Sequence, residues 1–240
     1  MMSRPVLSNA NIMATIANNL QLVRSRINAA CSRLGRSTDS IRLLAVSKTF
    51  PAEAVREAFD AGQRCFGENY VQEAIDKIQA LDPLRGEIEW HLIGPLQSNK
   101  TRVVAEHFDW VQTVDRLKIA QRLSEQRPDH LPPLQVLVQV NTSGEDTKSG
   151  VDPTEALTLA QQVAALPRLT LRGVMALPAP TPDPQAQAAA LAQVRVVFDQ
   201  LKAAGLPIDT LSMGMSGDLE AAVEQGSTMV RVGTAIFGHR

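Results

Sequence analysis

Short apolar segments alternate along this chain with longer stretches whose apolar residues recur at helical spacing. A continuously apolar run of this length is typical of a strand that is covered on both faces. The pattern predicts eight strands: Arg42–Lys48, Arg64–Gly67, Glu89–Gly94, Trp110–Val114, Leu134–Asn141, Leu169–Met175, Thr210–Met213 and Met229–Val232.

The stretches between these strands predict helices, several of which begin at Pro or end before Gly, as helix boundaries commonly do. The predicted helices are Pro51–Ala61, Tyr70–Leu81, Asn99–His107, Arg116–Gln126, Pro153–Ala165, Pro184–Ala204 and Asp218–Gln225. Strand–helix alternation repeated eight times is typical of a (βα)8 TIM-type barrel, and 240 residues suit one. We therefore expect a single α/β domain over 1–240, with an open doubly wound sheet as the alternative.

The segment 9–34 precedes the first predicted strand and has its own apolar stripe. The residues at helical spacing are Ile12, Ile16, Leu20, Val23 and Ile27. They predict an amphipathic helix packed on the barrel. The same region contains several Arg and no acidic residue before Asp39, which also resembles a transit peptide. The stripe continues into the fold without a cleavage-like break, so we favour the helix and a cytoplasmic location.

Composition excludes several classes of partner. The net charge is −1, from 24 basic and 25 acidic residues, which favours neither nucleic acid nor an anionic membrane surface. One Tyr, two Trp and six Phe are too few for a base-stacking platform. Cys31 and Cys65 form no CxxC motif and have no His close in sequence, so we expect no metal site, no disulfide framework and a reducing compartment. No apolar run approaches the roughly 20 residues that span a bilayer.

Lys48 closes the first predicted strand, at the carboxyl end where barrel active sites are built. Leu44, Val46 and Lys48 alternate onto one face of the strand, so the amine gains buried neighbours if that face points inward. Desolvation favours a neutral amine, and a neutral amine attacks an aldehyde. The alternative is a solvated lysine that follows a strand by chance.

Two turns after the last strands are rich in Gly and hydroxyl residues. Ser216 lies in the turn after the seventh strand, and Gly233 and Thr234 lie after the eighth. Each turn precedes a helix, where unpaired backbone N–H groups favour an anion, and these loops are the usual phosphate site of such barrels. The alternative is ordinary turn and capping chemistry.

In a closed barrel the first and eighth strands are neighbours, so Lys48 would face the anion site. A reactive lysine beside a phosphate site suits pyridoxal 5′-phosphate (PLP), bound as a Schiff base. Arg231 precedes the second turn and can donate to the pyridine nitrogen, which would leave that nitrogen unprotonated. Alternatively, Arg231 pairs with a carboxylate at the barrel rim.

The stretches LLAVSKTFP, FGENYVQEA, EWHLIGPLQSNK and LSMGMSGDLEAAVEQGSTMVRVGTAIFG resemble the pyridoxal phosphate homeostasis protein family. That family is related to the amino-terminal barrel of alanine racemase, of fold type III among PLP proteins. The resemblance extends from the first helix to Gly238. One departure is Gly217, where many relatives have an acidic residue, and this glycine is expected to loosen its turn.

The resemblance assigns roles to seven residues of this chain. It implies that Lys48 forms the Schiff base and that Arg231 faces the pyridine nitrogen. It implies further that the phosphate is held by Ser216, Gly233 and Thr234, and that Asn69 and His91 line the pocket. From the residues alone, His91 would be a hydrogen-bonded core side chain and Asn69 a helix cap.

A carrier and an enzyme remain as alternative functions. Racemases of this class need two bases, and in alanine racemase a tyrosine from the partner subunit's second domain is one of them, whereas the only tyrosine here is Tyr70. We therefore expect a monomer that binds, buffers and delivers PLP, with apo-PLP enzymes as transient partners and no catalytic turnover. The alternatives are a single-domain PLP-dependent amino-acid racemase or decarboxylase, and a Schiff-base aldolase without a cofactor.

The segment Asn141–Gly150 resembles a P-loop, but no Gly stands directly before Lys148, so nucleotide binding is rejected. Lys148 is expected to be a solvated loop lysine. A weaker hypothesis makes it a second site for the aldehyde.

Overall fold

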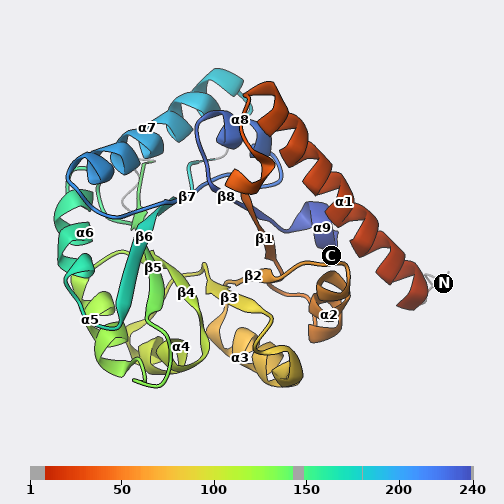
Figure 1. Ribbon diagram of the computed structural model, residues 1–240, viewed down its shortest axis with the longest axis horizontal. Coiled ribbons are helices and arrows are strands. Elements are labelled where there is room, and N and C mark those ends of the chain that lie inside the picture. The colour runs from red at the N-terminus through yellow and green to blue at the C-terminus, as the bar shows by residue number, and fades with distance from the viewer. Residues whose placement is uncertain (1–8, 143–148, 180, 239–240) are drawn as a thin grey trace, which may run out of the picture.

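A computed structural model describes residues 9–142, 149–179 and 181–238 of the chain. Eight parallel strands form a closed barrel in the order β1 to β8 (Figure 1). The strands are β1 (Arg42–Val46), β2 (Cys65–Glu68), β3 (Glu89–Leu92), β4 (Trp110–Val114), β5 (Leu134–Val140), β6 (Leu169–Ala176), β7 (Thr210–Ser212) and β8 (Met229–Val232). Because β1 pairs with β8, the predicted TIM-type barrel is confirmed and the open sheet is excluded.

Helices surround the barrel, as Figure 1 shows. They are α2 (Ala52–Asp60), α3 (Val71–Ala80), α4 (Thr101–His107), α5 (Leu117–Gln126), α6 (Ala156–Ala164), α7 (Pro184–Ala203), α8 (Leu219–Glu224) and α9 (Thr234–Phe237). Most end within two residues of the predicted bounds. The start of α6 comes three residues later than predicted, and α9 was not predicted, because four residues give no periodic signal.

Strand ends differ from the predicted ones where the backbone turns. The first strand ends at Val46, not at Lys48, because Thr49 has a φ of 70° and the chain leaves the sheet before it. The third strand ends at Leu92 rather than at Gly94. These ends place Lys48 in a turn above the sheet.

The core has two parts because each strand is covered on both faces. The larger part lies between the outer faces of the strands and the helices. Inside the barrel, the described apolar residues form two small clusters: Leu44, Val46, Cys65, Ile93 and Met229, and then Trp110, Leu137 and Met175. Polar side chains fill much of the remaining interior, including Gln112 and Arg231.

The predicted amino-terminal helix is present as α1 (Asn9–Arg33), which runs along the outside of the barrel beside α8 and α9 (Figure 1). The stripe residues from Ile16 to Ile27 are buried. Asn19 Nδ2 donates to the carbonyl of Ile236 at 2.9 Å, and Arg26 donates to the carbonyl of Ser216 at 3.1 Å. The helix therefore anchors the segments that follow the last two strands. None of the helices in the described ranges is both long and apolar enough to cross a bilayer.

Candidate functional site

The carboxyl end of β1 leads into a tight turn that holds Lys48. The N–H of Phe50 donates to the carbonyl of Ser47 at 3.1 Å, and Thr49 has a φ of 70°, the pattern of a type II turn. Ser47 is fully buried and its hydroxyl points toward β2, where it donates to Glu68 at 2.6 Å. Lys48, the next residue, is exposed.

The exposure of Lys48 corrects the expectation that its surroundings desolvate the amine. Leu44 and Val46, which alternate with it, are buried inside the barrel. The turn carries Lys48 beyond this buried layer, at the mouth of the barrel. An aldehyde can thus reach the amine from solvent.

The two hydroxyl-rich turns meet beside β1. Thr234 Oγ1 donates to Ser216 Oγ at 3.3 Å, so these two predicted residues lie together. A Cβ on Gly233 would lie 3.2 Å from the carbonyl oxygen of Val46, closer than an ordinary contact, so a glycine suits this approach of β8 to β1. The rings of Phe50 and Phe237 lie 5.2 Å apart, which packs the Lys48 turn on α9. The turn that holds Lys48 thus lies beside the Gly233–Thr234 turn at the end of β8.

Arg231 lies below these loops with only 3% of its surface exposed. Its guanidinium donates to Ser212 Oγ at 2.7 Å and to the carbonyl of Ala176 at 2.8 Å. Burial lowers its pKa to about 10. Among the described residues no carboxylate lies within ion-pair distance of Arg231, so within them the rim ion pair of the alternative interpretation is not found. The charge of Asp218 acts in the opposite direction on this pKa, as a longer-range attraction that is weaker than the effect of burial.

A cavity of about 350 Å³ opens over the ends of β2 to β7. Its lining includes Asn69, Gly94, Thr113, Gln139, Asn141 and Met215. Asn69 Oδ1 is buried there without a hydrogen-bond partner among the described residues, and such an acceptor suits a polar ligand. Lys148, the weaker candidate for an aldehyde site, lies outside the described residues.

His91 does not line this cavity, contrary to the expectation taken from the family resemblance. It is fully buried inside the barrel, where its ring stacks on Trp110 with centroids 5.0 Å apart. Burial lowers the pKa of His91, which favours the neutral imidazole. His91 is the hydrogen-bonded core residue that its alternative interpretation described.

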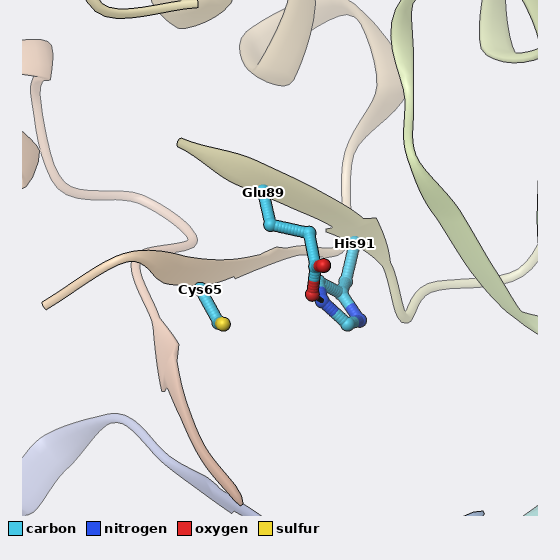
Figure 2. Close-up of side chains that lie close together, drawn as sticks. All are labelled: Cys65, Glu89 and His91. Atoms are coloured by element: carbon cyan, nitrogen blue, oxygen red, sulfur yellow. Dashed lines mark hydrogen bonds and ion pairs between the residues drawn. The ribbon is translucent and has the colours of Figure 1, made fainter. Parts of the chain in front are cut away.

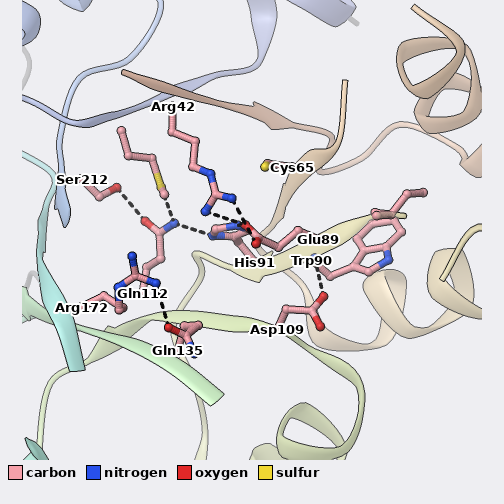
Figure 3. A network of polar contacts seen from close by, with 12 residues as sticks. Arg42, Cys65, Glu89, Trp90, His91, Asp109, Gln112, Gln135, Arg172 and Ser212 are labelled. Carbon is pink, nitrogen blue, oxygen red and sulfur yellow. Dashed lines mark hydrogen bonds and ion pairs between the residues drawn. The ribbon is translucent and has the colours of Figure 1, made fainter. Parts of the chain in front are cut away.

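A chain of hydrogen bonds connects Arg231 with His91 through the barrel interior, and Figure 3 shows its part from Ser212 to Glu89. Arg231 donates to Ser212, whose hydroxyl donates to Gln112 Oε1 at 2.7 Å. Gln112 Nε2 lies 2.9 Å from His91 Nδ1, and His91 Nε2 lies 2.6 Å from Glu89. With a neutral imidazole, each group donates to the next and the chain ends at a carboxylate. This polarity fixes how the Ser212 hydroxyl faces Arg231.

Sequence reasoning missed Gln112 and Ser212 as part of this site. The sequence feature that could have identified them is the two-residue alternation of strands. It places Ser212 on the same inward face as Thr210, and Gln112 on the same inward face as Trp110. Polar residues at such interior positions indicate a network or a ligand.

Cys65, Glu89 and His91 also meet inside the barrel, as Figure 2 shows, with potential ligand atoms within 4.8 Å of one another. The sequence analysis did not predict this cluster, because Cys65 and His91 lie far apart along the chain and meet only through the pairing of β2 with β3. Arg42 lies 2.9 Å from Glu89 and already neutralises its charge. Burial raises the pKa of the Cys65 thiol to about 12, so the thiol stays protonated. These groups form a structural network that disfavours a bound cation.

Comparison with known proteins places these features in a family. Residues 13–240 match the family model described as "Alanine racemase, N-terminal domain". The chain is 59% identical over 229 residues to the pyridoxal phosphate homeostasis protein of Escherichia coli K12, covering 95% of this chain and 98% of that one. PipY of Synechococcus elongatus, solved with PLP bound, is 39% identical with a TM-score of 0.81, over 93% of this chain and 100% of that one. An alanine racemase of Clostridium difficile shares the fold, with a TM-score of 0.76 at 17% identity, over 95% of this chain and 57% of that one.

The ion pair between Arg42 and Glu89 predicts that the stability of the fold depends on pH. Burial raises the pKa of Glu89, but the hydrogen bond from His91 and the charge of Arg42 outweigh it and lower this pKa to about 2. A depressed carboxylate pKa stabilises the fold above the unfolded value of about 4.3 and loses this contribution as the pH falls toward 2. We expect Glu89→Gln to cost up to about 3 kcal/mol at pH 7 and progressively less below pH 4, measured by urea unfolding.

The exposed Glu125 provides the control, since Glu125→Gln should leave the unfolding free energy within about 0.5 kcal/mol of the original protein at every pH. A Glu89→Gln deficit that stays constant from pH 7 to pH 2 would contradict the account of the ion pair.

Proposed function

This chain belongs to the pyridoxal phosphate homeostasis protein family, and we propose that it binds PLP covalently through Lys48 in order to buffer and deliver the cofactor. The observation that supports this most directly is the contact between the Lys48 turn and the Gly233–Thr234 corner. Val46 contacts Gly233, and Phe50 packs on Phe237. An amine and an anion site thus lie on neighbouring strands, as a phosphorylated aldehyde requires.

The residues present fit PLP on two independent features. The Asn69 Oδ1 acceptor is buried without a partner among the described residues, and the hydroxyls of Ser216 and Thr234 converge to 3.3 Å at the turns after β7 and β8. When bound, PLP supplies an aldehyde that forms a Schiff base with a lysine amine. In this proposal Lys48 provides the amine, and Ser216, Gly233 and Thr234 hold the phosphate through hydroxyl and backbone donors.

Arg231 has the task of holding the pyridine nitrogen. Arginine donates hydrogen bonds and keeps its own protons, so it leaves the nitrogen unprotonated. Its two bonds to Ser212 and Ala176 fix the guanidinium plane. A cofactor held in this way withdraws electrons weakly, which favours storage over carbanion chemistry.

We propose that the protein acts without catalytic turnover. The exposed position of Lys48 suits reversible capture and release, because the amine exchanges with solvent. Tyr70, the only tyrosine of the sequence, is 58% exposed at the start of α3, where it is available to solvent rather than enclosed as an opposing base. Apo-PLP enzymes are the proposed transient recipients.

We propose further that the protein is a cytoplasmic monomer. One chain closes its own barrel and supplies every residue assigned to PLP. Cys31 and Cys65 are free buried thiols, which a reducing compartment preserves.

The covalent bond predicts a specific loss in Lys48→Ala. Purified protein incubated with PLP should absorb at the edge of the visible range, and borohydride followed by mass spectrometry should locate the label on Lys48. Lys48→Ala should lose both signals, whereas Lys118→Ala, which removes an exposed lysine on α5, should keep them. Label that persists in Lys48→Ala at the original stoichiometry would assign the bond to another lysine and refute this proposal.

The phosphate assignment predicts a difference between two ligands. Thr234→Val keeps the side-chain shape but removes the hydroxyl, so PLP affinity should fall about tenfold, the effect of one hydrogen bond to a charged group. Pyridoxal lacks the phosphate, and its weaker affinity should stay the same in the variant. Equal losses for both ligands in equilibrium titrations would show that Thr234 acts elsewhere.

The carrier proposal predicts slow proton chemistry. Loaded protein incubated with a panel of amino acids in deuterated water should exchange no α-proton at ordinary enzymatic rates of about 1 s⁻¹ or more, as followed by NMR. Exchange or decarboxylation at such rates for any amino acid would replace the carrier with the enzyme.

A further inference from the structure

A buried lysine, Lys77, lies directly beneath the turn that holds the exposed Lys48. Lys77 on α3 has 5% of its side chain exposed, and its ammonium group reaches three acceptors. They are the carbonyl of Ser47 at 2.7 Å, Glu68 Oε1 at 2.8 Å and Glu73 Oε1 at 2.6 Å. The three donors of the ammonium group are thus all used, and they join the turn after β1 to β2 and α3.

The cluster holds the backbone on both sides of Lys48. Before it, Ser47 donates its hydroxyl to Glu68 and offers its carbonyl to Lys77. After it, the N–H of Thr49 donates to Glu73 Oε1. Lys48 is the one residue between these two fixed points, and its side chain is exposed.

The turn needs such support because Thr49 is in the left-handed region, with a φ of 70°. A β-branched residue rarely adopts this conformation, which costs free energy that surrounding contacts must supply. If Glu73 released the Thr49 N–H, the backbone could relax to a negative φ and change the direction in which Lys48 points.

We propose that Lys77 is a positioning residue for Lys48: through Ser47, Glu68 and Glu73 it holds the turn that aims the amine at the cofactor. This inference rests on the proposed binding of PLP through Lys48. Lys77 itself is too enclosed to serve as the amine, since its three donors are occupied and its side chain is buried.

Two substitutions test the proposal, one at the buried lysine and one at a partly exposed carboxylate. Lys77→Met removes the ammonium group and leaves Glu68 buried without a cation, so it lowers stability as well. Glu73→Ala acts on a carboxylate that is 30% exposed, frees the Thr49 N–H and keeps the buried Lys77–Glu68 pair, so it provides a folded variant.

Each substitution has a matched control. Arg127 is another buried cation, which donates to the carbonyls of Pro132, Ala105 and Phe108 at the opposite, amino-terminal end of the barrel. Arg127→Met therefore causes a comparable loss of stability away from Lys48. Asp76 is an exposed carboxylate on α3, and Asp76→Ala changes the charge as Glu73→Ala does.

The first measurement is hydrogen exchange of the protein without PLP, over peptides that contain residues 47–50. Lys77→Met and Glu73→Ala should each accelerate exchange there by about tenfold or more, as expected when a bond to a charged group is lost. The second measurement is PLP titration with the pH midpoint of the near-visible absorbance. Both variants should weaken binding by about tenfold and shift that midpoint, while both controls keep the original affinity and midpoint.

The outcomes separate this inference from the proposed function. If the original protein takes no label on Lys48, PLP binding through that residue fails, and the exchange data still report whether Lys77 orders the turn. If the original protein binds through Lys48 but Glu73→Ala and Lys77→Met match it in affinity, midpoint and exchange, the positioning role is refuted. If Arg127→Met changed the exchange, the PLP affinity and the pH midpoint by the same amounts, general destabilisation would explain the effect, and the positioning role would again be refuted.

Discussion

Hydrogen bonding between the first and last strands is the constraint on which the whole site depends. Parallel pairing sets Leu44 opposite Arg231 and Ala45 opposite Val232. That register brings the end of β8 against Val46 and makes the turns that hold Ser216, Gly233 and Thr234 neighbours of the Lys48 turn. A slip by one residue would exchange the inward and outward faces of β8, so that Arg231 would leave the interior. The geometry of the site is therefore a consequence of barrel closure and not of any single side chain.

The interior of this barrel is more polar than that of a typical TIM barrel, which is filled by layers of branched apolar residues. Arg231, Ser212, Gln112 and His91 replace part of such layers with a directed chain of hydrogen bonds. Buried polar groups are costly unless each has a partner, and a fully satisfied network fixes its members in one arrangement. The lower half of the barrel thus serves as a rigid support for the guanidinium at the upper end. At the mouth, the Oδ1 acceptor of Asn69 has no partner within the part of the chain that the structure describes.

Much of this could be predicted from the sequence, because apolar runs and helical spacing report burial directly. The eight strands, the first helix and the nearness of the end of β1 to the end of β8 followed from alternation and barrel closure. The exposure of Lys48 did not, because it depends on the backbone of Thr49, whose left-handed φ has no signal in a β-branched residue. The depth of His91 and its meeting with Cys65 depend on strand register, which periodicity does not specify. The helix α9 was too short to give a pattern.

The pairing of β1 with β8 also has a consequence for the synthesis of the protein. A nascent chain emerges from its amino end, so Lys48 leaves the ribosome long before the segment around Gly233 is made. Contacts between such distant parts of a sequence form late, because a long loop must close first. Until that closure the Lys48 turn lacks the neighbours that β8 and α9 give it. A translation product that stops before β8 therefore has Lys48 but not the Gly233–Thr234 turn, and in the proposed function only a completed chain captures the cofactor.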